Sequence, residues 1–237
     1  MRDGRDVNGL PGYWMFEDLT VSQARQIQLQ LRDRILFEPP DGFDPRLAAG
    51  ADVAFDRARK MAFAAVVVID LESMATVDVA TAAMPVSFPY VPGYLSFREL
   101  PALAAAWRKL VKLPDVAILD AHGYAHPRRM GLACHAGIVF DLPAIGCAKS
   151  VLVGEVVRLT PERGARSPLL DPRTGEELGW ALRTRTGVRP VYVSVGHRID
   201  LPTAADLILR LTPSGRYRCP ETTRRADRLA AELKRTR

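Results

Sequence analysis

Apolar and polar residues alternate with different periods along the first third of the chain. Apolar residues recur at helical spacing from Val21 to Phe37, and Thr20 or Ser22 can cap the segment. Three strand-like apolar runs follow it, at residues 47–55, 61–69 and 75–83. Because the connections between these runs have the length of hairpin loops, the pattern predicts an antiparallel meander of three strands.

The rest of the chain alternates helical and strand-like segments. A helix predicted from Phe97 to Lys112 precedes the continuous apolar run Val116–Leu119, which is typical of a strand buried on both faces of a sheet. Further predicted elements are helices at 128–140 and 201–211, the second capped by Thr203, a strand at 144–153, a hairpin of 180–186 with 191–195, and an exposed excursion at 161–179. This succession predicts an α/β fold, in which helices flank a mixed β-sheet.

Composition and charge narrow the class of protein. The chain has 237 residues and a net charge of +6, and residues 216–237 carry eight Lys or Arg against three Asp or Glu. No repeat or composition shift divides it, which predicts one domain over residues 1–237 with a helix at each end packed on a core of residues 47–211. Ala226, Leu229, Ala230 and Leu233 give the basic C-terminal helix an apolar stripe, so we expect one face to dock and the other to meet phosphate or solvent.

The same survey limits the location and partners of the protein. No apolar run approaches the roughly 20 residues that cross a bilayer, and the N-terminus has no apolar signal core. We therefore expect a cytoplasmic protein without a membrane partner. We also expect a monomer. The three cysteines form no C-x-x-C pair, so the sequence indicates neither a disulfide framework nor a thiolate zinc site.

Acidic residues stand within and directly after predicted strands. Asp52 lies inside the first strand and Asp120 ends the buried strand 116–119. A buried carboxylate is costly unless it is paired or bound to a cation, so each is either a structural hydrogen-bond acceptor or a metal ligand. If these two strands are neighbours, both side chains reach one cleft, near Glu99 of the helix between them. One or two carboxylates with room for substrate phosphate suit Mg²⁺, which predicts a phosphodiester site.

A rigid loop precedes that helix. Pro89 and Pro92 hold Tyr90 in an extended segment, where its ring could act as a wedge, or could simply pack as a loop residue. Ser96 and Glu99 have the spacing of a capping box, so Glu99 could also serve only to close the helix end.

Basic side chains follow Asp120. His122 and His126 lie in an irregular loop and are either functional or hydrogen-bonded loop histidines. Lys149 follows small residues at the end of a strand, where its cation could hold a phosphate or stabilise charge that develops in a transition state.

Together these residues resemble the endonuclease V family, nucleases that act at deaminated purines. The matching blocks, in family order, are residues 50–56, 88–99, 120–128, 131–137, 145–150 and 195–198. The resemblance implies a ribonuclease H-like fold and the use of Mg²⁺, or Mn²⁺ in its place. It also implies cleavage of the second phosphodiester bond 3′ to a hypoxanthine nucleotide in DNA, leaving 3′-hydroxyl and 5′-phosphate ends.

The resemblance assigns roles to the matching positions. Asp52 and Asp120 would ligate the metal, Glu99 and His126 would help to hold the attacking water, and Lys149 would orient it or stabilise phosphate charge. The wedge would be Pro89, Tyr90, Val91 and Pro92. The pocket for the everted base would be formed by Gly93, Leu95, Ala121, Gly131 and Leu132, together with His126. Arg98, His135 and His197 would be supporting residues.

One position departs from the family, and two alternatives stay open. Ala121 stands where the family commonly has glycine, and its methyl group would narrow the pocket. The first alternative is an endoribonuclease specific for inosine in RNA, because the same cleft could accept a 2′-hydroxyl. The second is a nucleic-acid-binding protein without catalysis, which the basic tail favours.

Overall fold

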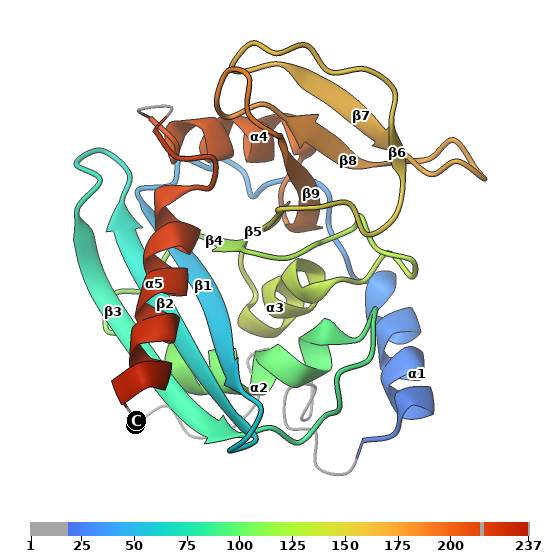
Figure 1. Cartoon of the computed structure of the whole chain (residues 1–237). Coiled ribbons are helices and arrows are strands. Elements are labelled where there is room, and N and C mark those ends of the chain that lie inside the picture. Colours follow the sequence, from blue (N-terminus) through green and yellow to red (C-terminus); the bar gives the residue numbers. More distant parts are fainter. Residues whose placement is uncertain (1–18, 214–215, 237) are drawn as a thin grey trace.

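The computed structural model describes residues 19–213 and 216–236. Within the described residues, the strands form one nine-stranded sheet in the order β3-β2-β1-β4-β5-β9-β8-β7-β6 (Figure 1). The strands are β1 Leu47–Asp56, β2 Met61–Asp70, β3 Thr76–Pro85, β4 Val116–Leu119, β5 Ala144–Ala148, β6 Glu155–Val156, β7 Arg166–Leu170, β8 Glu177–Leu182 and β9 Val191–His197. The helices are α1 Val21–Arg32, α2 Leu95–Trp107, α3 Leu132–Phe140, α4 Leu201–Arg210 and α5 Glu221–Thr236.

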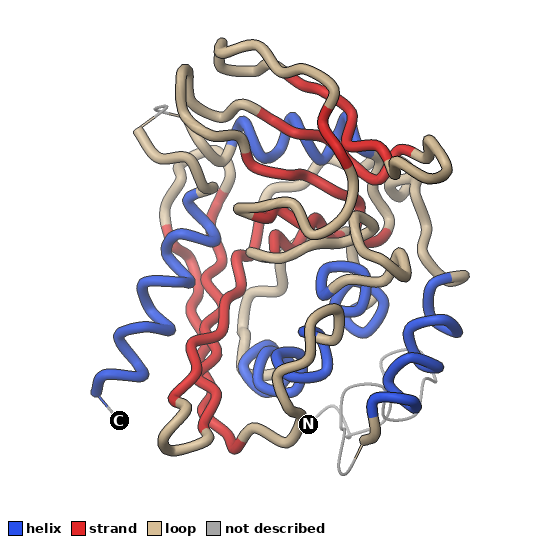
Figure 2. Tube along the Cα trace, turned by 45° about the vertical axis from the view of Figure 1, so that its right-hand side comes forward, coloured by secondary structure: helices blue, strands red, loops and turns tan. Residues whose placement is uncertain are grey.

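The predicted meander is confirmed, and helices cover both of its faces. β1 and β3 each pair antiparallel with β2. Ala64, Val66 and Val68 of β2 belong to the apolar cluster that contains the buried side chains of α2. The alternate positions, Val67 and Ile69, pack with Ala226 of α5. Since successive side chains of a strand point to opposite faces, α2 and α5 lie on opposite sides of the meander (Figure 2).

The centre of the sheet is parallel, as the apolar run at 116–119 predicts. β4 pairs parallel with β1 on one side and with β5 on the other, and all four of its residues are buried. β9 then returns antiparallel along β5. The fold is therefore α/β, with an antiparallel meander joined to parallel strands.

The remaining helices pack around this sheet. α3 contacts β5 and β9, α4 contacts β8 and β9, and α1 packs on α3 at the edge of the molecule (Figure 1). Thr20 caps α1 by accepting the backbone N–H of Gln23, as expected. Among the described residues, no helix is both long enough and apolar enough to cross a bilayer.

The capping box predicted for Ser96 and Glu99 is wrong. α2 begins at Leu95 with Tyr94 as its N-cap, and no side chain bonds to the cap. A tight turn sets this start: Gly93 has φ of +80°, and the Tyr94 N–H donates to the carbonyl of Val91. Because the turn leads directly into the helix, Ser96 and Glu99 both lie inside it, and Glu99 is free for another role.

Two other predictions are corrected. Thr203 is not the cap of α4; Asp200 is, because its Oδ1 accepts the Thr203 N–H at 2.7 Å. Residues 161–179 are not only an exposed excursion, since β7 and the start of β8 lie within them. Pro168 lies within β7, although proline usually argues against a strand. It is tolerated because β6 pairs only with Leu169 and Leu170, so the proline has no β6 partner.

Some boundaries also differ. α1 ends at Arg32 and not at residue 37, α2 ends at Trp107 and not at residue 112, α3 begins at Leu132 and not at residue 128, and β5 ends at Ala148 and not at residue 153.

Candidate active site

Asp52 and Asp120 stand side by side where β1 and β4 separate. The parallel register pairs Gly50 with Ile118 and Ala51 with Leu119, so the next pair in that register is Asp52 with Asp120. Adjacent strands lie about 4.8 Å apart, and residues in register point to the same face. The sheet therefore brings the two carboxylates together, as the sequence predicts.

Gly50 explains how α5 reaches this place. A Cβ on Gly50 would lie 2.1 Å from the backbone carbon of Thr222, so only glycine allows the beginning of α5 to cross β1 here. The close crossing brings Asp227 of α5 near Asp52, whose pKa its charge helps to raise. Sequence reasoning missed Asp227, because a single acidic residue in a basic helix carries no distinct signal.

Electrostatics show that the acidic groups form one cluster. The pKa of Asp52 is raised to about 7, first by burial and then by the negative charges of Asp120 and Asp227. The pKa of Glu99 is raised well above its usual range by burial and by the charges of Asp52 and Asp120, although Arg98 lowers it. Four elements, β1, α2, the end of β4 and α5, thus contribute carboxyl groups to this cluster.

Lys149 partly neutralises this cluster. Its Nζ forms an ion pair with Oδ2 of Asp120 from the loop after β5. Burial alone would lower the pKa of Lys149, but the hydrogen bond and charge of Asp120 raise it. The lysine is therefore a cation beside the carboxylates, where the sequence predicts it.

The donor set fits a divalent cation through a pair of carboxylates. In residues 19–213 and 216–236, no group of three or more His, Cys, Asp or Glu side chains is arranged to hold a metal ion by itself. Mg²⁺ usually takes only one or two protein carboxylates and completes its shell with water and substrate phosphate. A cation between Asp52 and Asp120 would also relieve the repulsion that raises the pKa of Asp52.

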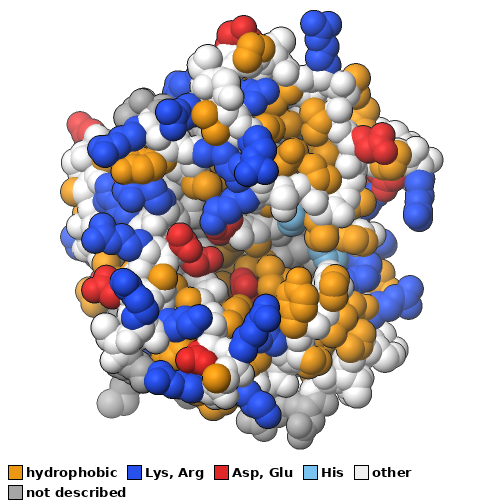
Figure 3. Space-filling model, in the orientation of Figure 1, with side chains coloured by type: hydrophobic (Ala, Val, Ile, Leu, Met, Phe, Trp, Pro, Cys, Tyr) orange, Lys and Arg blue, Asp and Glu red, His pale blue; other side chains and the backbone are white. Residues whose placement is uncertain are grey.

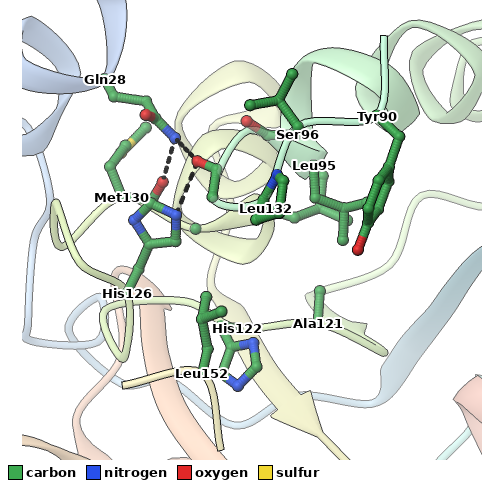
Figure 4. Close-up of a pocket in the computed structure, with 14 residues that line it drawn as sticks. Gln28, Tyr90, Leu95, Ser96, Ala121, His122, His126, Met130, Leu132 and Leu152 are labelled. Atoms are coloured by element: carbon green, nitrogen blue, oxygen red, sulfur yellow. Dashed lines mark hydrogen bonds between the residues drawn. The ribbon is translucent and has the colours of Figure 1, made fainter. Parts of the chain in front are cut away.

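A cavity of about 150 Å³ is lined by Ala121, the residue directly after Asp120 (Figure 4). All five residues predicted for the base pocket line it, as do His126 and the wedge residues Tyr90, Val91 and Pro92. Pockets for drug-sized ligands span roughly 300–1,000 Å³, so this cavity suits a group the size of a nucleobase. Gly131 admits no side chain, because a Cβ would lie 2.2 Å from the His122 carbonyl oxygen.

The wedge loop is exposed but firmly anchored. Tyr90 is 72% exposed, whereas Phe88 is 2% exposed and packs with Tyr94 and Phe97. Arg98 donates from Nη1 to the carbonyl of Phe88 at 3.1 Å. A protruding ring on a fixed base is the arrangement that a wedge requires.

His126 lies in the cavity wall as a neutral imidazole. Its Nε2 is 3.0 Å from the carbonyl oxygen of Gly93 and must carry the proton, while Nδ1 accepts the backbone N–H of Arg128 at 3.2 Å. Burial, followed by the positive charge of Arg128, lowers its pKa to about 4. Both ring nitrogens are bonded to the backbone, so the geometry supports a pocket role, and the catalytic role stays a prediction.

The three residues predicted as supporting are not brought together. Arg98 lies beside the cluster, with its guanidinium 4.4 Å from the ring centre of Phe55. His135 is buried in α3 against Phe97, with ring centres 5.2 Å apart. His197 is buried at the end of β9, where its Nδ1 accepts the Leu36 N–H at 3.3 Å. The two histidines therefore contact neighbouring segments, α2 for His135 and the segment after α1 for His197.

Other cavity residues were not assigned to the pocket from the sequence. Gln28, Ser96, Met130 and Leu152 were missed, whereas His122 was a candidate without an assigned role. His122 links two loops, since its Nε2 is 2.9 Å from the carbonyl oxygen of Ser150. Figure 3 shows acidic side chains in a hollow of this face, with histidine beside them and Lys and Arg around the rim.

The mixed sheet carries a pair of carboxylates at the point where two parallel strands separate. This arrangement is that of a ribonuclease H-like nuclease. The Endonuclease V family model matches residues 29–228. The chain is 50% identical over 218 residues to the Endonuclease V of Myxococcus xanthus, which covers 92% of this chain and 91% of that protein. It belongs to the Endonuclease V family, and it is thus an endonuclease.

Solved structures agree with this assignment. The Endonuclease V of Streptomyces avermitilis matches with a TM-score of 0.86 and 45% identity, over 92% of this chain and 94% of that one. The Endonuclease V of Ciona intestinalis, in complex with a 24mer DNA containing an inosine followed by a ribo-adenosine, matches with a TM-score of 0.75 and 28% identity, over 92% and 99%. The family comprises DNA repair nucleases that are generally metal-dependent.

Proposed function

We propose that the protein is a Mg²⁺-dependent DNA repair endonuclease that recognises deoxyinosine and related deaminated bases. It hydrolyses the second phosphodiester bond 3′ to the lesion, in the cytoplasm, as a monomer and as a single nuclease domain over residues 1–237. Mn²⁺ is expected to substitute for Mg²⁺. The observation that carries the proposal is the cluster of Asp52, Glu99 and Asp120 directly beside a cavity of nucleobase size.

The carboxylates and Lys149 would perform the hydrolysis. Asp52 and Asp120 would hold the cation, which when bound supplies neutralisation of the phosphate oxygens. Water attacks phosphorus, and the bond to the 3′ oxygen breaks, which leaves a 3′-hydroxyl and a 5′-phosphate. Glu99 lies beside both aspartates, where its carboxylate would help to hold the attacking water and accept its proton. The Lys149 ammonium would stabilise the negative charge that develops on the phosphate.

The wedge and cavity would select the lesion. An enzyme that reads a base in a duplex must first turn it out of the stack, and an inserted side chain can fill the vacated space. Tyr90 protrudes next to the cavity opening and suits that role. The everted base would enter the cavity between Gly93 and Gly131, where the absence of side chains leaves the backbone open to its edge. The methyl group of Ala121 lines the same space and narrows it.

Cleavage of a duplex that carries one deoxyinosine tests the proposal. With Mg²⁺, the nick should map to the second phosphodiester bond on the 3′ side, and Asp120→Asn should abolish it. Cleavage at an unrelated position, or equal cleavage of an undamaged duplex, would contradict the proposed substrate.

Inosine in RNA is a second candidate substrate, and one observation favours it. The Ciona intestinalis relative was crystallised with DNA in which the inosine is followed by a ribonucleotide. Matched DNA and RNA oligonucleotides with one inosine, compared at equal enzyme concentration, separate the two substrates. The remaining alternative, a binding protein without catalysis, does not fit a member of a nuclease family.

A further inference from the structure

One backbone carbonyl in the cavity wall receives three hydrogen bonds. The carbonyl oxygen of Gly93 accepts from Gln28 Nε2 at 3.1 Å, from His126 Nε2 at 3.0 Å and from Arg128 Nη2 at 2.5 Å. Gly93 occupies the tight turn that carries the wedge loop into α2. The position of this turn is therefore fixed by side chains from α1 and from the loop after β4.

Gln28 joins two segments that line the cavity. Its Nε2 also donates to the carbonyl of Met130 at 3.0 Å, and its Oε1 accepts from Arg128 Nε at 2.5 Å. Both residues line the cavity, Gly93 from the turn before α2 and Met130 from the segment before α3. Figure 4 shows the Gln28 amide extending from α1 to two backbone oxygens at the edge of the cavity. One carboxamide thus bridges two segments that share no strand pairing, alongside the bonds that His126 and Arg128 make to Gly93.

The position of Gln28 on α1 is unusual for a glutamine. It is 1% exposed and lies on the buried stripe of the helix with Ala24 and Leu31. Burying an amide is costly unless its donors and acceptor are satisfied, and here each polar atom of the side chain has a partner. By contrast, Gln26 on the same helix is exposed. Gln28 also lies one residue before the segment that the family model matches.

We propose that Gln28 is a positioning residue that fixes the width of the base cavity and so sets the selectivity for the deaminated base. The inference rests on the proposed function, because it concerns the same cavity. Gln28 does not reach the carboxylates, and it acts through the Gly93 turn and the Met130 backbone. Its loss therefore widens or loosens the cavity and leaves the hydrolytic groups in place.

Two variants distinguish a positioning role of Gln28 in the cavity from a role that only attaches α1 to the core. Gln28→Glu keeps the acceptor for Arg128 but removes both N–H donors to the cavity walls. Gln28→Leu removes all three bonds at nearly constant volume. Gln26→Glu and Gln26→Leu, on the exposed side of α1, are the matched controls.

The experiment is single-turnover cleavage of a deoxyinosine duplex over a range of enzyme concentrations, with an undamaged duplex as competitor. For both Gln28 variants, the half-saturating concentration for the lesion duplex should rise about tenfold, equivalent to about 1.4 kcal/mol, with the maximal rate nearly unchanged. Affinity for the undamaged duplex should stay constant, so discrimination falls. Thermal unfolding of Gln28→Glu is measured in parallel.

The outcomes are distinct. Unchanged discrimination in both Gln28 variants, matching the Gln26 controls, would overturn the inference and leave the proposed function intact. So would a Gln28→Glu variant that loses affinity, maximal rate and thermal stability alike for every duplex, since that is the result of a purely structural role. A wild-type protein that does not cleave the deoxyinosine duplex would overturn the proposed function, and this inference with it.

Discussion

Lys149 and Asp120 form an ion pair at the point where the parallel strands end, although they are 29 positions apart in the chain. The Asp120 side chain is 12% exposed and that of Lys149 is 47% exposed, so the lysine reaches inward from the surface to the carboxylate. Asp120, the predicted metal ligand, is therefore a direct neighbour of Lys149, the residue predicted to stabilise phosphate charge.

Replacing Lys149 with methionine should slow the chemical step. Removing one preorganised donor to developing charge typically costs about 10²–10³-fold in rate, so the single-turnover rate on a deoxyinosine duplex should fall by that order. Binding of the lesion duplex should change only slightly, because the wedge and cavity are intact. Lys112→Met, at an exposed lysine, is the control. An unchanged rate in Lys149→Met would remove the lysine from the mechanism.

Asp52→Asn should stabilise the protein in the absence of metal. The folded-state pKa of Asp52 is about 7 against an ordinary 3.8, so its contribution to stability is present below pH 3.8 and is lost as pH rises through 7. At pH 8 with a chelator, the variant should unfold with a free energy roughly 1–3 kcal/mol higher than that of the wild type. The gain should shrink toward pH 5. A variant less stable than the wild type at pH 8 would show that the carboxylate is not repelled by its neighbours.

Buried neutral histidines should make the fold sensitive to acid. Burial lowers the pKa of His197 to about 4, and Arg198 adds to the effect. Because the folded pKa lies below the unfolded value of about 6.5, the stability that this histidine contributes is complete above pH 6.5 and is lost as pH falls through 4. The loss amounts to roughly 3 kcal/mol at most. Urea unfolding of His197→Asn and the wild type, compared from pH 7.5 to pH 4.5, should give curves that converge toward acid; parallel curves would refute the assignment.

Tyr90→Ala should reduce discrimination without affecting the fold. The side chain is 72% exposed, and exposed substitutions usually change stability by no more than about 0.5 kcal/mol. The preference for a deoxyinosine duplex over an undamaged one should fall, while the maximal cleavage rate changes less. Tyr90→Trp, which keeps an aromatic ring, should retain most of the preference. Equal losses in lesion binding and in the maximal rate of Tyr90→Ala would argue against a wedge.

The sequence predicts the frame of this site because its signals are local. Proline restraint marks the wedge loop, and a continuous apolar run marks β4 with Asp120 at its end. Once β1 and β4 are adjacent, their register alone brings Asp52 to Asp120. The helix between these strands supplies Glu99, and the strand end after small residues supplies Lys149. The family resemblance adds the cavity residues, which line one pocket.

The remainder depends on contacts between distant segments. Ser96 and Glu99 match the capping-box pattern, but the Gly93 turn starts α2 early and overrides it. Asp227 joins the cluster only because Gly50 lets α5 cross β1 closely. Gln28 becomes important through bonds to segments 65 and 102 positions away. No local pattern encodes such pairings.

The most direct test of the central claim, that Asp52 and Asp120 share one divalent cation, is the metal-dependent shift in thermal unfolding. Mg²⁺ or Mn²⁺ at 100 times its dissociation constant should stabilise the wild type by about 2.7 kcal/mol. Asp52→Asn and Asp120→Asn should each abolish the shift, and the exposed control Glu72→Gln should keep it. A shift of equal size in both aspartate variants would contradict the account.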